Sequence, residues 1–325
     1  MIRYLLRRLL YAVPILLGVN LLTFCLFFMV NTPDDIARMH LGVKHVNHAA
    51  ILNWEHSHGY DLPLFYNRHE TSWHTLTDTL FVHKSLSMFT LHFGLSDDGR
   101  DIAREIRQRA GPSLSIALPA FIIGLGTNIS LALMLVWMRA GLADRVGVII
   151  AVALMSVSGL FYIIGGQFVI AHLWRWVPIS GFVPGVDSWR FVLLPIAISV
   201  IAGIGNGMRW YRSIFLEEIG KDYVRTARAK GLDESRILFR HVLKNGMIPI
   251  LTGAVAVLPL LFMGSLLTES FFGIPGLGSY VVDAIQSQDF AVVRAMVFIG
   301  SALYLIGLWL TDIAYGWVDP RVRLS

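Results

Sequence analysis

The sequence predicts an all-α protein that crosses a membrane several times. Hydrophobic residues make up 55% of the 325 residues, charged residues only 15%, and the mean hydropathy is +0.61. Soluble domains contain about 25% charged residues, so this chain is too apolar for that class. Its net charge of +5 is explained by basic residues at the ends of apolar runs, which orient membrane proteins. We therefore expect lipid around the chain and no nucleic-acid partner.

Six uncharged stretches are each long enough to cross a bilayer, which takes about 17 to 25 apolar residues. They cover residues 9–30, 113–138, 146–172, 191–208, 247–268 and 295–311. The first is expected to stay attached as an anchor, because no small-residue cleavage site follows it. The chain then divides into an N-terminal segment with the first span (1–30), an external segment (31–112) and a core with spans two to six (113–325).

Basic residues gather in every second connection between the spans. The connection at 209–246 holds nine lysines and arginines, whereas the alternate short connections hold only Arg175, Arg190 and Arg294. By the positive-inside rule, the basic connections and both termini are expected in the cytoplasm. The segment 31–112 is too long for the rule to count, and by alternation it lies outside.

The basic connection contains a short helix pattern. Asp222 is expected to cap its start, Ala227 and Ala229 favour helix, and Gly231 can take the left-handed conformation that ends a helix. A short, basic helix between two membrane spans offers a surface to which another protein can bind.

A second helix pattern follows directly. Asp233 is expected to start it, Arg236, Arg240 and Lys244 recur every four residues along one face, and Gly246 is expected to end it. Two short capped helices on the inner surface of a membrane protein indicate a docking site.

The interiors of the predicted spans contain no Asp, Glu, Lys or Arg, which argues against a proton-driven or sodium-driven pump because such pumps carry intramembrane charges. A passage through the spans would be lined by backbone, hydroxyl and amide groups. The candidates for such a lining are Asn128, Ser156, Ser158, Asn206, Ser265 and Thr268. The same side chains also form ordinary hydrogen bonds between helices, so both interpretations stay open.

No motif for phosphate binding or hydrolysis is present. The pattern G-x-x-x-x-G-K-[ST] does not occur, nor do G-x-S-x-G and H-E-x-x-H. We therefore expect no catalytic residue, no metal site and no cofactor on this chain. Any energy from ATP must come from a partner protein.

Three separated motifs lie in order along the second half of the chain. The first comprises Asp222, Tyr223, Arg225, Ala227, Arg228, Ala229, Gly231 and Leu232. The second comprises Glu269, Pro275, Gly276 and Gly278, and the third Asp312, Asp319, Pro320 and Arg321. Together they resemble the dipeptide and oligopeptide branch of the bacterial ABC importer permeases, in which the first motif is the coupling loop, the second a turn after span five and the third the C-terminal signature.

This resemblance implies the type I ABC importer permease fold in the bacterial inner membrane. It also implies three kinds of partner: a second, homologous permease, two cytoplasmic ATPases that hold ATP and magnesium, and an external substrate-binding protein. In the broader superfamily a glutamate of the Glu-Ala-Ala pattern stands where this chain has Arg225. The polar contact with the ATPase is therefore expected from Asp222, Arg225 and Arg228.

The cargo is less defined than the fold. The resemblance favours peptides, but nine of the eleven histidines fall between residues 40 and 92, and nickel importers share this permease family. Pairs such as His45 and His48, or His56 and His58, are potential metal ligands, so a nickel importer remains an alternative. An ATP-independent channel or membrane scaffold is a further, less favoured one.

Overall fold

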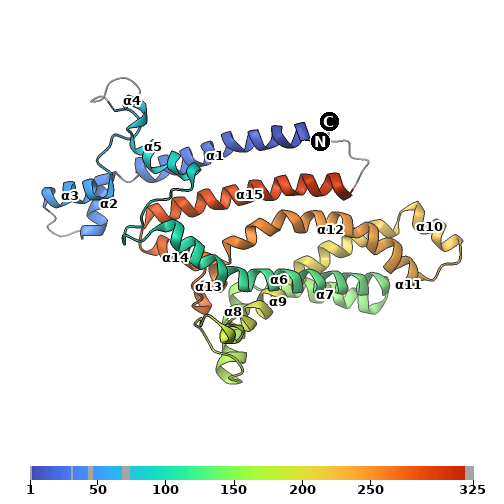
Figure 1. Cartoon of the computed structure of the whole chain (residues 1–325). Helices are drawn as coiled ribbons and strands as arrows, with labels where there is room; N and C mark the ends of the chain where they lie inside the picture. The colour runs from blue at the N-terminus through green and yellow to red at the C-terminus, as the bar shows by residue number, and fades with distance from the viewer. Residues whose placement is uncertain (1, 31, 43–46, 68–73, 319–325) are drawn as a thin grey trace. The chain divides into compact units, whose positions relative to one another are not determined.

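A computed structural model describes residues 2–30, 32–42, 47–67 and 74–318, and within these ranges every regular element is a helix (Figure 1). Five helical stretches are long and apolar enough to cross a membrane: Leu10–Met29, Ile102–Trp137, Val186–Ile219, Glu234–Met263 and Phe290–Gly316. A bent pair of helices, Leu142–Ser156 and Gly159–Leu173, forms a sixth span when the pair is counted as one. The expected all-α, multi-span fold class is confirmed.

The chain forms two compact units, and several long helices contribute to both. The first, which we call the N-terminal unit, comprises residues 2–108 and 281–305. Its helices are α1 (Ile2–Val30), α2 (Pro33–Leu41), α3 (His48–His58), α4 (His74–Thr77), α5 (Leu80–Lys84) and the 3₁₀ helix η1 (Leu86–Thr90). The adjoining parts of α6 (Ile102–Trp137), α14 (Leu277–Gln286) and α15 (Phe290–Val318) complete it. Aromatic side chains dominate its core, in which Phe24, Phe28 and Tyr60 are buried with Ile36 and Leu80.

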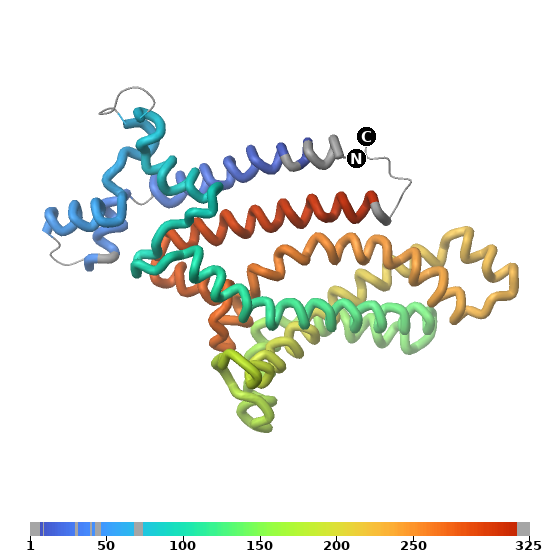
Figure 2. Tube along the Cα trace, in the orientation of Figure 1, coloured from blue at the N-terminus to red at the C-terminus, as the bar shows by residue number. Residues whose placement is uncertain are grey.

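The second unit, which we call the core unit, comprises residues 109–280 and the chain from 306 onward. Its first helices are α6 (Ile102–Trp137), α7 (Leu142–Ser156), α8 (Gly159–Gly166), the π-helix η2 (Gln167–Leu173), the 3₁₀ helix η3 (Val186–Ser188) and α9 (Trp189–Ile219). They are followed by α10 (Asp222–Ala229), α11 (Glu234–Arg236), the π-helix η4 (Ile237–Val242), α12 (Leu243–Val257), the 3₁₀ helix η5 (Leu258–Met263), α13 (Leu266–Phe272), α14 (Leu277–Gln286) and α15 (Phe290–Val318). The continuous tube in Figure 2 shows that α9 leads directly into α10.

The third predicted span, residues 146–172, is not a single straight helix. It breaks after Ser156, and the two halves meet at 87°. Val157 and Ser158 adopt extended backbone conformations. The Ser156 hydroxyl donates to the backbone oxygen of Val152 at 2.7 Å, a type of bond that often bends helices. Uniform hydrophobicity along the stretch concealed this break.

Gly246 does not end a helix, contrary to the sequence prediction. It lies inside α12, and the helical path continues from Glu234 to Met263. The Phe215 ring of α9 fills the place where a Cβ atom on Gly246 would lie. The glycine therefore serves the close approach of two helices rather than a turn.

Candidate functional site

The predicted coupling loop forms a short helix, α10, between α9 and the long helix that begins at Glu234 (Figure 1). One face of α10 is buried, because Val224 and Ala227 join a hydrophobic cluster with residues of α6, α7, α9 and η4. The opposite face is open: the side chains of Asp222 and Arg225 are 95% and 76% exposed. Such a helix is attached firmly to the core unit and offers charged side chains to a partner.

The two ends of α10 differ from the sequence prediction in one respect. Asp222 does not cap the helix: Lys221 occupies the cap position without a side-chain bond, and Asp222 instead lies 3.5 Å from Arg225. Gly231 does adopt the left-handed conformation, with φ of +75°. Asp233 caps the next helix, accepting a hydrogen bond from the backbone N–H of Ser235.

Ion pairs hold this end of the core unit together. Arg228 donates to the carboxylate of Glu234 at 2.5 and 3.3 Å, which closes the turn around Gly231. Arg212 of α9 donates through Nε and Nη2 to the two oxygens of Asp144 of α7, at 2.9 and 2.8 Å. We call the part of the core unit that comprises α10, the turn around Gly231 and these two ion pairs the coupling end.

Further contacts place more of the basic residues at the coupling end. Arg139, in the turn between α6 and α7, lies 4.0 Å from Glu234. The hydroxyl of Tyr223 donates to Glu218 at 2.8 Å, and Lys221 pairs with the same carboxylate. Burial raises the pKa of Tyr223 to about 12, so this tyrosine stays a neutral donor at physiological pH.

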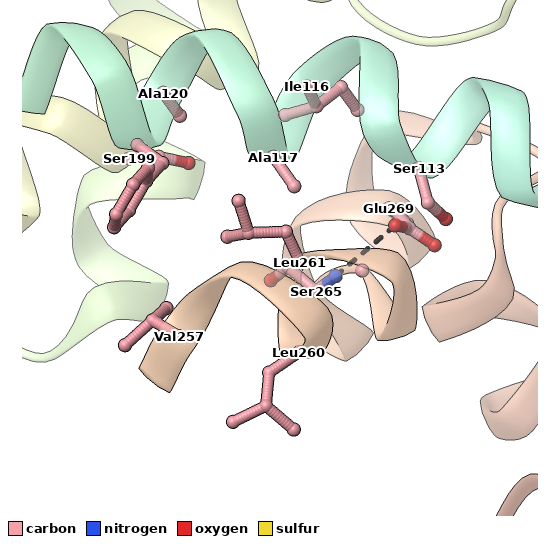
Figure 3. A pocket seen from close by; sticks show the side chains of 12 residues that line it. Ser113, Ile116, Ala117, Ala120, Ser199, Val257, Leu260, Leu261, Ser265 and Glu269 are labelled. Carbon is pink, nitrogen blue, oxygen red and sulfur yellow. Dashed lines mark hydrogen bonds between the residues drawn. The ribbon is translucent and has the colours of Figure 1, made fainter. Parts of the chain in front are cut away.

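A cavity of about 340 Å³ lies within the core unit, among α6, α9, α12, η5 and the start of α13 (Figure 3). It is lined by Ser113, Ile116, Ala117, Ala120, Phe121, Ser199, Val257, Leu260, Leu261, Gly264, Ser265 and Glu269. The lining is mainly apolar, with three hydroxyl groups and one carboxylate, a composition typical of small-molecule sites. The volume of the cavity lies at the lower end of the usual range for such sites.

Glu269 is the charged group of this cavity, and it is only 1% exposed. Its carboxylate accepts hydrogen bonds from the backbone N–H groups of Ser265 at 3.2 Å and Ser279 at 3.1 Å. Burial raises the pKa of Glu269, and hydrogen bonds from Ser113, Ser279, Ser265 and Gly278 oppose that rise. No ion pair to Glu269 is found in the described part of the chain.

Glycines make this arrangement possible. A Cβ atom on Gly264 or on Gly276 would collide with the Glu269 carboxylate and the Ser113 hydroxyl. Ser113 in turn accepts a hydrogen bond from the N–H of Leu277 at 2.7 Å. The motif predicted as a turn after span five is therefore a helix, a glycine-rich turn and a second helix, all tied to one carboxylate.

The six residues predicted to line a passage fall in different places. Ser265 lines the cavity, and Thr268 donates its backbone N–H to Ser265 Oγ. Asn128 is buried against Gly207, whereas Ser156, Ser158 and Asn206 are exposed and do not line this cavity. Their role in a pathway stays a prediction.

Sequence reasoning missed Ser113 and Ser199, which line the cavity, and assigned no specific contact to Glu269. A signal for Glu269 exists in the sequence: a lone carboxylate lies beside the glycine-rich stretch 273–278, where a backbone can approach closely. Of the C-terminal motif, Asp312 is buried, while Asp319, Pro320 and Arg321 lie outside the described residues.

The histidine-rich segment shows no metal centre in the described residues, since no three His, Cys, Asp or Glu side chains converge there. His83 pairs with Asp78 at 3.0 Å, and His56 lies 3.7 Å from Asp61. His45 and His69 lie outside the described residues.

Comparison with known proteins identifies two family models along the chain. A model described as the binding-protein-dependent transport system inner membrane component matches residues 112–324. A second, described as the N-terminal part of such a membrane component, matches residues 1–91.

Curated relatives match along almost the whole chain. A probable peptide ABC transporter permease of Sinorhizobium fredii is 29% identical, over 98% of this chain and 99% of the relative. A glutathione transport system permease of Salmonella choleraesuis is 31% identical over 99% of both chains. A putative peptide transport system permease of Brucella abortus is 31% identical over 98% of both.

Proposed function

Because this chain belongs to the family of binding-protein-dependent transport inner membrane components, we propose that it forms half of the translocation pathway of an ATP-driven importer. The chain is a multi-pass protein of the bacterial inner membrane. In this proposal a second permease supplies the other half, two cytoplasmic ATPases bind ATP and magnesium, and an external binding protein delivers the cargo.

The geometry of α10 is the observation that carries this proposal. Its buried face is packed into the core unit, and its charged face is open. The same helix α9 that leads into α10 carries Ser199 on the cavity wall. Glu218, near the end of α9, lies 19 residues from Ser199, about 29 Å along a helix. A displacement of α10 would therefore be transmitted along the helix α9 to the cavity.

The proposal places α10 and both termini in the cytoplasm. The basic-residue count supports this side for the connection at 209–246. The proximity of Arg139 to Glu234 supports it as well, because it brings the two basic connections of the core unit to one end.

We propose di- or oligopeptides as the cargo, on the basis of the relatives, which are named for peptide and for glutathione transport. Glutathione is a tripeptide, so both names indicate one substrate class. The cavity's mixture of apolar surface, hydroxyl groups and one carboxylate is compatible with a small peptide. The chain itself performs no chemistry in this mechanism.

The test is ATP-driven uptake by the reconstituted transporter. Arg225→Glu reverses a charge on the open face of α10 without touching the core, so we expect a normal folded protein whose ATP-driven peptide uptake falls at least tenfold, the effect of about 1.4 kcal/mol at the contact with the ATPase. Arg190→Glu is the matched control, since Arg190 is an exposed arginine at the opposite end of α9. Uptake by Arg225→Glu at the control level, with ATP hydrolysis still coupled to uptake, would contradict the proposal.

A further inference from the structure

The N-terminal unit holds a second cavity, of about 300 Å³, which we call the Arg294 cavity. Its walls include three side chains that can carry positive charge, Lys84, His83 and Arg294, and apolar groups such as Leu62 and Phe93. None of the described residues that line it carries a carboxylate. A cavity with a basic wall and an apolar wall suits an amphiphilic anion.

Arg294 is the unusual member of this wall, because it is a buried cation with unused donors. It is 3% exposed. Nη2 donates to the backbone oxygen of Lys84 at 3.3 Å, and the guanidinium lies 4.8 Å from the centre of the Phe28 ring. Nε and Nη1 have no hydrogen-bond partner among the described residues. Burying an arginine with unfilled donors is costly unless an anion completes the site.

Lys84 adds a second charge to the same cavity. Its amino group donates to the backbone oxygen of His58 at 2.6 Å and lies 4.9 Å from the centre of the Tyr60 ring. Burial lowers the pKa of Lys84, and the Arg294 charge lowers it further, while Asp97 offsets part of the effect. His83 already contacts the carboxylate of Asp78. Lys84 and Arg294 therefore repel each other. Asp97 acts on both cations but does not line the cavity, and the pKa of Lys84 stays lowered in spite of it, so an anion in the cavity would stabilise the pair further.

The position of the cavity along its helices indicates where that anion comes from. Helix α15 has 29 residues, about 43 Å at 1.5 Å per residue, whereas the hydrocarbon core of a bilayer is about 30 Å thick. Helix α15 is therefore long enough to extend beyond the hydrocarbon core. Arg294 lies four residues after the start of α15, and its neighbour Phe28 lies two residues before the end of α1. Both residues lie close to the same ends of the candidate spans Leu10–Met29 and Phe290–Gly316, which favours headgroup depth for the cavity.

From these observations we propose that the Arg294 cavity binds the headgroup of an anionic phospholipid. The phosphate would accept hydrogen bonds from Arg294 and lie beside the Lys84 amino group, and the apolar walls at Leu62 and Phe93 would contact the glycerol and upper acyl chains. Basic pockets between membrane helices bind anionic headgroups on the cytoplasmic side of membranes, and the same chemistry would act at the external end, where the expected topology places this cavity. The lipid would tie the end of α1 to the start of α15.

The test measures which lipids stay bound to the full-length protein in its transporter complex. The complex is purified from nanodiscs that contain equal amounts of phosphatidylglycerol and phosphatidylcholine, and the retained lipid is identified by mass spectrometry. We expect phosphatidylglycerol to be enriched in the wild type. Arg294→Gln should reduce that enrichment about fivefold, the contribution of one basic residue near anionic lipid. Arg104→Gln, an exposed arginine of the same unit, should leave it unchanged.

A second variant and a second titration complete the test. If Arg294→Gln does not fold, Lys84→Gln should show a similar loss. Equal retention of the two lipids by the wild type would overturn the proposal without any variant. Titration of the purified complex with inorganic phosphate distinguishes a soluble anion: phosphate binding that requires Arg294, without phosphatidylglycerol enrichment, would also overturn the lipid assignment.

Discussion

Two buried carboxylates of the core unit, Asp144 and Glu269, are held in opposite ways. At the coupling end, both oxygens of Asp144 are paired with the guanidinium of Arg212. At the cavity, Glu269 has no cation beside it in the described residues, and backbone N–H groups and a hydroxyl satisfy its oxygens instead. One carboxylate is neutralised by charge, the other only by dipoles.

The two regions also differ in how many contacts hold each of them together. The coupling end spreads its attachment over several pairs, Asp144 with Arg212, Arg228 with Glu234 and Glu218 with Lys221. The loss of one pair leaves the others. The region around Glu269, which we call the cavity end, depends more on one side chain, because the Glu269 carboxylate accepts from Ser265, just before α13, and from Ser279 of α14. The cavity end is therefore more vulnerable to a single substitution than the coupling end.

The largest expected effect is from Glu269→Ala. It leaves the N–H groups of Ser265 and Ser279 buried without a partner, so we expect a loss of about 3 kcal/mol or more in the free energy of unfolding. Thermal unfolding of the purified protein in detergent measures this. Thr268→Val, which changes a neighbouring buried residue without removing the carboxylate, is the control. A melting temperature for Glu269→Ala equal to that of the control would contradict the proposed role of the carboxylate.

Breaking the pair between Asp144 and Arg212 is expected to have the next largest effect. Asp144→Asn leaves Arg212, whose side chain is 23% exposed, without its charge partner, and we expect a loss of about 2 kcal/mol, less than for a fully buried pair. A double-mutant cycle with Arg212→Gln isolates the pair. The comparison of the two ends fails if this loss exceeds that of Glu269→Ala.

The two ends should also differ in their response to pH. Burial raises the pKa of Glu269 above its ordinary value of 4.5, so the folded protein holds this proton more tightly than the unfolded chain. The resulting stabilisation is complete below pH 4.5 and is lost as the pH rises through the folded-state pKa. Wild type should therefore lose stability over that window, and Glu269→Gln should not, in melting curves recorded across pH. A pH dependence that is identical in both proteins would exclude Glu269 as its source.

The sequence predicted the outline of the coupling end better than that of the cavity. Periodicity, Gly231 and Asp233 are local signals, and they placed α10 and the start of the next helix close to their observed positions. The break after Ser156 and the role of Gly246 depend on contacts with other helices, so hydrophobic pattern did not reveal them. The cavity required more still: Ser113 and Glu269 are 156 residues apart, and no single-sequence pattern relates two such positions.

The smallest effect is expected from the exposed pair of Arg228 and Glu234, whose side chains are 36% and 55% exposed. Arg228→Gln should cost about 0.5 kcal/mol, because solvent screens a pair at the surface. The cost should shrink further when melting curves are recorded at high salt, whereas the cost of Glu269→Ala should not change. If salt reduced both costs equally, the cavity carboxylate would be stabilised by distant charges rather than by its backbone donors, and the contrast between the two ends would disappear.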